Sequence, residues 1–263
     1  MNALATIRAP LFVPANRPER FEKAARSGTD AVILDLEDAV AADAKDAARS
    51  ALRGDFTDLP VIVRINAMAS VAHETDLVAV KALRPAAIIL PKAEAPELAE
   101  VLAMSLPCPI IALIETAQGL AHARQIAAVR GVARLAFGSV DFCADLGCAH
   151  QRDVLAPARF ELVLASRLAG IAAPFDGVTV RLDDLSQTSD DAAHARDIGM
   201  GGKLCIHPGQ VEPVLNAFSP GEAEIAWARR VLAAGDGAVQ VDGAMVDEPV
   251  RVRARAILHR AGL

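Results

Sequence analysis

The chain has 263 residues, of which 53% are hydrophobic and 3% aromatic, and its formal net charge at pH 7 is -6. The acidic balance argues against nucleic acid as a partner, because binding along phosphates requires clustered Lys and Arg. No apolar run approaches the roughly 20 residues of a membrane-spanning helix and the N-terminus lacks a signal-peptide pattern, so we expect a cytoplasmic protein with no membrane contact.

Eight short apolar runs are predicted to be β-strands. They are apolar throughout rather than alternating, which is typical of parallel strands that are covered on both faces. The runs are residues 9–15, 30–36, 60–66, 86–92, 108–116, 132–139, 177–180 and 203–208.

Segments with helical spacing and frequent Ala lie between these strands. Regular alternation of strand and helix produces βα units, and eight of them fit a (β/α)8 TIM barrel better than an open doubly wound sheet. We therefore predict an α/β protein in which residues 1–219 form a TIM-barrel catalytic domain. Residues 220–263 are predicted to form a C-terminal helical and hairpin extension of the same domain, which caps the barrel or reaches a neighbouring subunit.

Polar side chains follow most of the predicted strands. In a parallel barrel the functional groups gather at the C-terminal ends of the strands. The polar residues at these ends are Asn16, Arg17, Asp35, Glu37, Asp38, Arg64, Asn66, Lys92, Glu115, Asp141, Arg181 and His207.

Two of these acids form a candidate metal site. Glu115 and Asp141 follow apolar strands on neighbouring units, and two carboxylates with water suit Mg²⁺ or Mn²⁺. Arg64 either binds a substrate carboxylate bidentately or forms an ion pair with the acids of the second strand. Lys92 is expected to stay charged in an ion-pair network rather than form a Schiff base.

Several segments, taken together, resemble the citrate lyase beta subunit-like branch of the HpcH/HpaI aldolase superfamily. They occur in order over nearly the whole chain and read LFVPANRPERFEKA, DAVILDLEDAV, VRIN, ILPKAE, IETAQG, FGSVDF, GKLCIHPGQV and GAMVDEP. The resemblance implies a TIM barrel in which Glu115 and Asp141 bind Mg²⁺ and Glu115 also contacts the substrate. It further implies that Arg64 contacts the substrate carboxylate as part of the catalytic machinery.

Other positions follow from the same resemblance. Arg8, Lys45 and Arg49 fall at motif positions that imply a role in substrate binding. Asp247 in the C-terminal extension is implied to perform acid–base chemistry over an active site, often that of an adjacent subunit. The likeness also suggests a homotrimer or hexamer.

The acids of the second strand, Asp35, Glu37 and Asp38, then have a supporting role. We expect them to hydrogen-bond waters on the metal and to pair with basic residues such as Lys92, rather than to bind the metal themselves.

The implied reaction is a metal-assisted carbon–carbon cleavage of a 3-hydroxy-acyl thioester of the malyl-CoA, citramalyl-CoA or citryl type. The partners are then a small oxo or hydroxy acid and an acyl-CoA, with Arg17, Arg20 and Lys23 as candidate contacts to coenzyme A. Two alternatives stay open: the beta subunit of a citrate lyase complex acting on citryl-carrier protein, and a malate-synthase-like condensing enzyme or thioesterase.

Overall fold

The computed structural model describes residues 3–235 and 237–263. The chain divides into two compact units, Met1–Leu215 and Asn216–Leu263. The assignment of residues 1–219 and 220–263 as parts of one domain stays a prediction.

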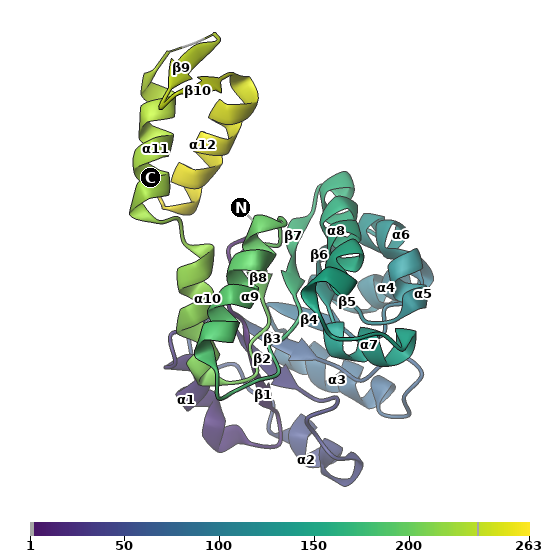
Figure 1. Cartoon of the computed structure of the whole chain (residues 1–263). Coiled ribbons are helices and arrows are strands. Elements are labelled where there is room, and N and C mark those ends of the chain that lie inside the picture. Colours follow the sequence, from purple (N-terminus) through teal and green to yellow (C-terminus); the bar gives the residue numbers. More distant parts are fainter. Residues whose placement is uncertain (1–2, 236) are drawn as a thin grey trace. The chain divides into compact units, whose positions relative to one another are not determined.

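The first unit is built on one sheet of eight parallel strands that are paired in sequence order. A parallel bridge between Leu11 and Cys205 joins the end of this sheet to its beginning. The TIM-barrel-like α/β fold predicted from the sequence is therefore confirmed (Figure 1). The strands are β1 Leu11–Pro14, β2 Val32–Asp35, β3 Val61–Arg64, β4 Ala87–Leu90, β5 Ile110–Ile114, β6 Val132–Phe137, β7 Ala172–Asp176 and β8 Gly202–Lys203.

Helices alternate with these strands and form the outer layer (Figure 1). The α-helices are α1 Phe21–Ala25, α2 Lys45–Ser50, α3 His73–Leu83, α4 Pro96–Ser105, α5 Ala117–Ala121, α6 Ala123–Ala128, α7 Ser139–Leu146, α8 Arg152–Ala169, α9 Leu185–Asp197 and α10 Val211–Phe218. Single 3-10 turns occur at η1 Ala3–Ala5, η2 Pro18–Arg20, η3 Ala42–Ala44 and η4 Pro208–Gln210.

Apolar side chains fill the barrel, and its amino-terminal end is closed by Arg134. The core includes Ile62, Ile111 and Phe175 from three different strands. The Arg134 guanidinium is fully buried and donates to the carbonyl oxygens of Leu4, Ile7 and Ala173 at 2.7–2.8 Å. Arg134 therefore fills the amino-terminal end of the barrel interior.

The seventh strand lies earlier in the chain than predicted. β7 is Ala172–Asp176, whereas residues 177–180, the predicted strand, form the loop that follows it. Pro174 lacks an N–H group and so argues against a strand in the sequence. The β6–β7 register shifts between Arg134 and Ala136, opposite Pro174, and this irregularity accommodates the proline.

The second unit contains the helix and hairpin expected of the C-terminal extension. It comprises α11 Glu222–Ala233, the antiparallel strands β9 Val239–Val241 and β10 Ala244–Val246, and α12 Glu248–Arg260. A small apolar core of its own joins these elements and includes Val231, Val246 and Ile257. Among the described residues, no helix is both long and apolar enough to cross a membrane.

Candidate active site

The carboxyl ends of the barrel strands surround a cavity of about 290 Å³. Five of the ionisable residues singled out in the sequence line it, namely Asp35, Asp38, Arg64, Glu115 and Asp141. Its apolar wall includes Phe12, Leu113, Phe137 and Leu204. The fold thus gathers side chains from distant parts of the chain at one end of the barrel.

Glu115 directly follows β5, and only 2% of its surface is exposed. The backbone N–H of Lys92 donates to Glu115 Oε1 at 2.8 Å. Lys92 holds this N–H in place with a left-handed backbone (φ 48), a conformation that costs a non-glycine residue about 1–3 kcal/mol. Burial, together with the negative charges of Glu37 and Asp141, raises the pKa of Glu115 to about 8.

The space for Glu115 depends on Gly138. A Cβ atom at position 138 would lie 2.4 Å from Glu115 Cβ and 2.5 Å from Glu115 Oε2. Gly138 follows β6, and its N–H donates to the carbonyl oxygen of Ile114, so the two backbones are fixed beside each other.

We expect Gly138→Ala to displace the Glu115 carboxylate and to weaken Mg²⁺ binding about tenfold or more, at a stability cost of roughly 1–3 kcal/mol. Gly54→Ala is a matched control, because a Cβ there meets only Leu83 at 3.8 Å. Calorimetric titration of both variants with Mg²⁺ checks this. Unchanged affinity in Gly138→Ala would show that Glu115 does not have to occupy its observed position.

Asp141 lies in the first turn of α7 rather than at the end of the sixth strand, and it is exposed. It lines the same cavity as Glu115. Within residues 3–235 and 237–263, no group of three or more His, Cys, Asp and Glu side chains is placed to hold a metal. Two carboxylates that leave the other coordination positions to water and substrate fit Mg²⁺, which usually retains several waters. The crowding of negative charge around buried Glu115 also favours a cation there.

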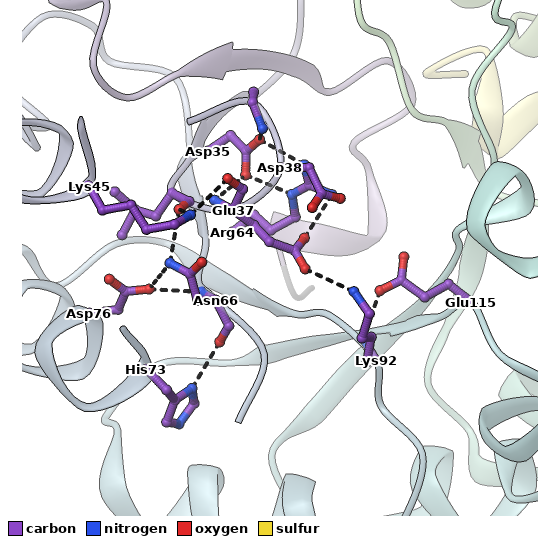
Figure 2. A network of polar contacts seen from close by, with 12 residues as sticks. Asp35, Glu37, Asp38, Lys45, Arg64, Asn66, His73, Asp76, Lys92 and Glu115 are labelled. Atoms are coloured by element: carbon purple, nitrogen blue, oxygen red, sulfur yellow. Dashed lines mark hydrogen bonds and ion pairs between the residues drawn. The ribbon is translucent and has the colours of Figure 1, made fainter. Parts of the chain in front are cut away.

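The acids at and after the end of β2 form a network around Arg64 (Figure 2). Arg64 donates through Nε and Nη2 to the two carboxylate oxygens of Asp35, each at 2.7 Å. Asp35 is fully buried and also accepts the backbone N–H groups of Glu37 and Ala39. The ion pair with the second strand, one of the two interpretations of Arg64, is thus present. Arg64 also lines the cavity. The hydrogen bonds to Asp35 occupy only two of the five N–H donors of the Arg64 guanidinium.

Glu37 lies between Arg64 and Lys92 (Figure 2). Its Oε2 is 3.0 Å from Arg64 Nη1, although the alignment does not make a hydrogen bond, and its Oε1 is 3.5 Å from Lys92 Nζ. Burial raises the pKa of Glu37 to about 7, against the lowering effect of Arg64. Asp38 is more exposed, with Oδ2 at 3.9 Å from Arg64 Nη1. That these acids act on waters of a bound metal stays a prediction.

Lys45 and Arg49 bind the segments that follow β2 and β3. Lys45 Nζ donates to the carbonyl oxygens of Leu36 and Glu37 at 2.8 and 3.0 Å. Arg49 donates to Asp76, whose other oxygen accepts the backbone N–H and side-chain amide of Asn66, two residues beyond β3. Lys45 therefore holds the loop that carries the cavity residues Asp38 and Ala39, and Arg49 holds the loop after β3. The substrate contact expected of both basic residues stays a prediction.

The remaining predicted residues are not among those that line the cavity. Arg8 precedes β1 at the amino-terminal end of the barrel, and its backbone N–H donates to Asp30, so the fold does not bring it to the cavity. Arg17, Arg20 and Lys23 are exposed on the segment that follows β1. Asp247 belongs to the second unit, where its side chain accepts the Val250 N–H at 3.4 Å and caps α12.

Two features of the cavity were missed by sequence reasoning. Gly138 makes room for Glu115, and the Phe12 ring lies 4.9 Å from the Arg64 guanidinium carbon. The glycine directly after a predicted strand was an available signal for the first. Phe12 had no signal, because it is one apolar residue within an apolar strand.

The raised pKa values predict a pH-dependent stability. Glu115 and Glu37 have folded-state pKa values above their ordinary value of 4.5, so the native protein binds more protons than the unfolded chain between that value and about 8. Their contribution is therefore fully present below pH 4.5 and is lost as the pH rises through about 7 to 8.

Without metal, we expect the free energy of unfolding to fall by about 1–3 kcal/mol between about pH 5 and pH 8. Saturating Mg²⁺ should suppress this fall, because the cation offsets the carboxylate charges. Scanning calorimetry in EDTA and in Mg²⁺ measures the difference, with Glu115→Gln as the variant that loses most of the pH dependence. A Tm that is equally pH-dependent with and without Mg²⁺ would contradict the prediction.

Comparison with known proteins gives a consistent result. A sequence model described as HpcH/HpaI aldolase/citrate lyase matches residues 8–208. A citrate lyase subunit beta-like protein of Mycobacterium tuberculosis is 40% identical over 273 aligned residues, which cover 100% of this chain and 98% of the relative. A (3S)-malyl-CoA thioesterase of Cereibacter sphaeroides is 36% identical, with 97% and 94% covered. The crystal structure of the protein CitE from M. tuberculosis, in complex with magnesium, acetoacetate and coenzyme A, superposes with a TM-score of 0.89 at 39% identity and covers 98% of this chain and 100% of that one.

Proposed function

The chain belongs to the HpcH/HpaI aldolase/citrate lyase family, and from this membership we propose that it is a Mg²⁺-dependent carbon–carbon lyase. Its substrate is a 3-hydroxy-acyl thioester of the malyl-CoA, citramalyl-CoA or citryl type. The observation that carries the proposal is the shared cavity of Glu115, Asp141 and Arg64, two carboxylates for a hard cation beside a guanidinium for a substrate carboxylate.

Glu115 and Asp141 hold Mg²⁺ in this proposal, and Mn²⁺ is expected to replace it. When bound, the metal polarises the substrate oxygen and offsets the negative charge that develops as the carbon–carbon bond breaks. The fit rests on the buried position of Glu115 and on the hard oxygen donors of both residues.

Arg64 positions the substrate carboxylate. Asp35 fixes the guanidinium from one side through two hydrogen bonds, so the remaining N–H groups are oriented before the substrate arrives. Glu37 and Lys92 form an ion pair beside Arg64. The backbone N–H of Lys92 also holds the Glu115 carboxylate.

Asp247 moves the proton. The substrate hydroxyl must lose a proton before cleavage, and the thioester enolate that leaves must gain one. We place Asp247 in one of these steps, acting from a neighbouring subunit of a homotrimer or hexamer. Arg17, Arg20 and Lys23, exposed after the first strand, bind the phosphates of coenzyme A.

A second candidate is hydrolysis of the thioester by the same site. The observation that favours it is the 36% identity to a relative named as a (3S)-malyl-CoA thioesterase. Action on citryl-carrier protein within a citrate lyase complex is the third, and co-purification with further subunits would distinguish it.

The test is a panel of malyl-CoA, citramalyl-CoA and citryl-CoA, each incubated with the protein and Mg²⁺ and followed by chromatography of every CoA species. Cleavage releases acetyl-CoA and a keto acid, whereas hydrolysis releases free CoA and the intact hydroxy acid. The lyase proposal fails if no member of the panel yields acetyl-CoA in a Mg²⁺-dependent reaction.

A further inference from the structure

A second cavity, of about 280 Å³, lies among the start of α8, the loop after β7 and helix α9. Residues from all three elements line it, including Arg152 and Arg159 of α8, Thr179 of the loop and Gln187 of α9. Val178 is the one lining residue it shares with the first cavity. The Glu115–Asp141 site makes no use of this second cavity.

Positive charge exceeds negative charge at this cavity. Arg159 Nε and Lys203 Nζ both bind buried Asp176, at 2.7 and 3.1 Å, and Arg152 binds Asp191 at 2.8 Å. Three cations therefore share two carboxylates, which leaves one positive charge without a counterion in the cavity wall.

Arg159 has an unused donor. The residue is only 6% exposed, and its Nη1 is buried without a hydrogen-bond partner in the described part of the chain. A buried N–H group without an acceptor costs about 1–3 kcal/mol, so native structures seldom retain one. Arg159 lines the cavity, so an anion that enters it would remove this cost once the guanidinium turns and brings Nη1 to the cavity surface.

The start of α8 adds further donors. The helix runs for 18 residues from Arg152, and its N-cap residue Gln151 makes no side-chain capping bond. The first N–H groups of a helix lack partners within it and carry a partial positive charge. Gln151, Arg152 and Leu155 line the cavity, so this uncapped first turn borders it.

His150 connects the two cavities. Its Nε2 is 2.9 Å from Ser139 Oγ, and Ser139 lines the first cavity whereas His150 lines the second. Burial and the neighbouring Arg159 and Lys203 lower the pKa of His150, which favours the neutral form of the ring.

We propose that this cavity is an oxyanion site, which binds the carboxylate or phosphate group of a small molecule separately from the metal site. The Arg159 guanidinium in the cavity wall, the first turn of α8 and the net positive charge are the features that recognise the anion. The site goes beyond the proposed lyase function, because its ligand binds without Mg²⁺ and outside the cavity of Glu115.

Calorimetric titration of the full chain in EDTA, with inorganic phosphate and separately with malonate, tests the proposal. We expect saturable binding of at least one anion, weakened about tenfold in Arg159→Gln, which corresponds to roughly 1.4 kcal/mol. Arg152→Gln should weaken anion binding similarly, because Asp191 then faces the cavity without its ion-pair partner. Arg152 is exposed, so this variant tests the proposal if Arg159→Gln does not fold. Arg167→Gln removes a charge from the last turn of the same helix and should leave binding unchanged.

Saturation by phosphate alone or by malonate alone identifies which group the site accepts, and either result supports the proposal. It is overturned if neither anion saturates, if a folded Arg159→Gln binds as tightly as the wild type, or if Arg152→Gln binds no more weakly than the control Arg167→Gln. Since no metal and no thioester is present, the outcome is independent of whether the protein is a lyase.

Discussion

Glu115→Gln is expected to abolish measurable Mg²⁺ binding and to lower kcat/KM for thioester cleavage by roughly 1,000-fold or more. Glutamine keeps the shape of the side chain and an oxygen that can accept the Lys92 N–H, so the local structure should persist. What is lost is the negative charge and one of the two proposed carboxylate ligands. Titration with Mn²⁺ followed by electron paramagnetic resonance, together with the CoA assay, measures both effects.

Glu100→Gln is the matched control, since this residue is an exposed carboxylate on α4. It should bind Mn²⁺ and turn over substrate like the wild type. If Glu115→Gln retained both metal affinity and activity, the assignment of Glu115 as a metal ligand would be wrong.

Asp247→Asn is expected to lower kcat by roughly 100- to 10,000-fold while leaving the Tm nearly unchanged. The Asp247 side chain accepts the Val250 N–H at the start of α12, and asparagine can make the same capping bond. The substitution therefore removes the proposed proton-transfer group but keeps the cap. Asp247→Ala removes both and should also cost about 1 kcal/mol of stability.

Asp184→Asn provides the control for this experiment. Asp184 caps α9 through the Gln187 N–H, which is the same structural role in the first unit, and it does not line the metal cavity. Its activity should equal that of the wild type. Full activity in Asp247→Asn, with loss of activity only in Asp247→Ala, would assign Asp247 a purely structural role.

The order of the strands and the end of the barrel where the polar residues gather could be predicted from the sequence. Continuous apolar runs separated by helical segments allow few other folds, and polar residues that follow such runs must meet at one edge. The seventh strand could not be placed, because Pro174 interrupts its apolar run. Val178 and Val180, in the loop that follows, have the residue type that is typical of a strand. This error also hid the pairing of Asp176 with Lys203, which are register partners in β7 and β8.

Within the site, single residues were easier to predict than the contacts between them. Residue type and position predicted that Glu115, Asp141 and Arg64 would gather at one place, where they do line one cavity, but the sequence left two partners open for Arg64. The choice depended on register: Asp35 and Arg64 are directly paired in β2 and β3, although 29 positions separate them. The buried Arg159 was invisible for the same reason, since its partner Asp176 is brought near only by the packing of α8 on the sheet.

The metal assignment can be tested most directly by anomalous diffraction from crystals grown with Mn²⁺. We predict one strong peak within coordination distance of both Glu115 and Asp141, with Asp35, Glu37 and Asp38 reaching it only through water. A direct bond from any of these three carboxylates to the ion, or a peak away from Glu115, would contradict the account.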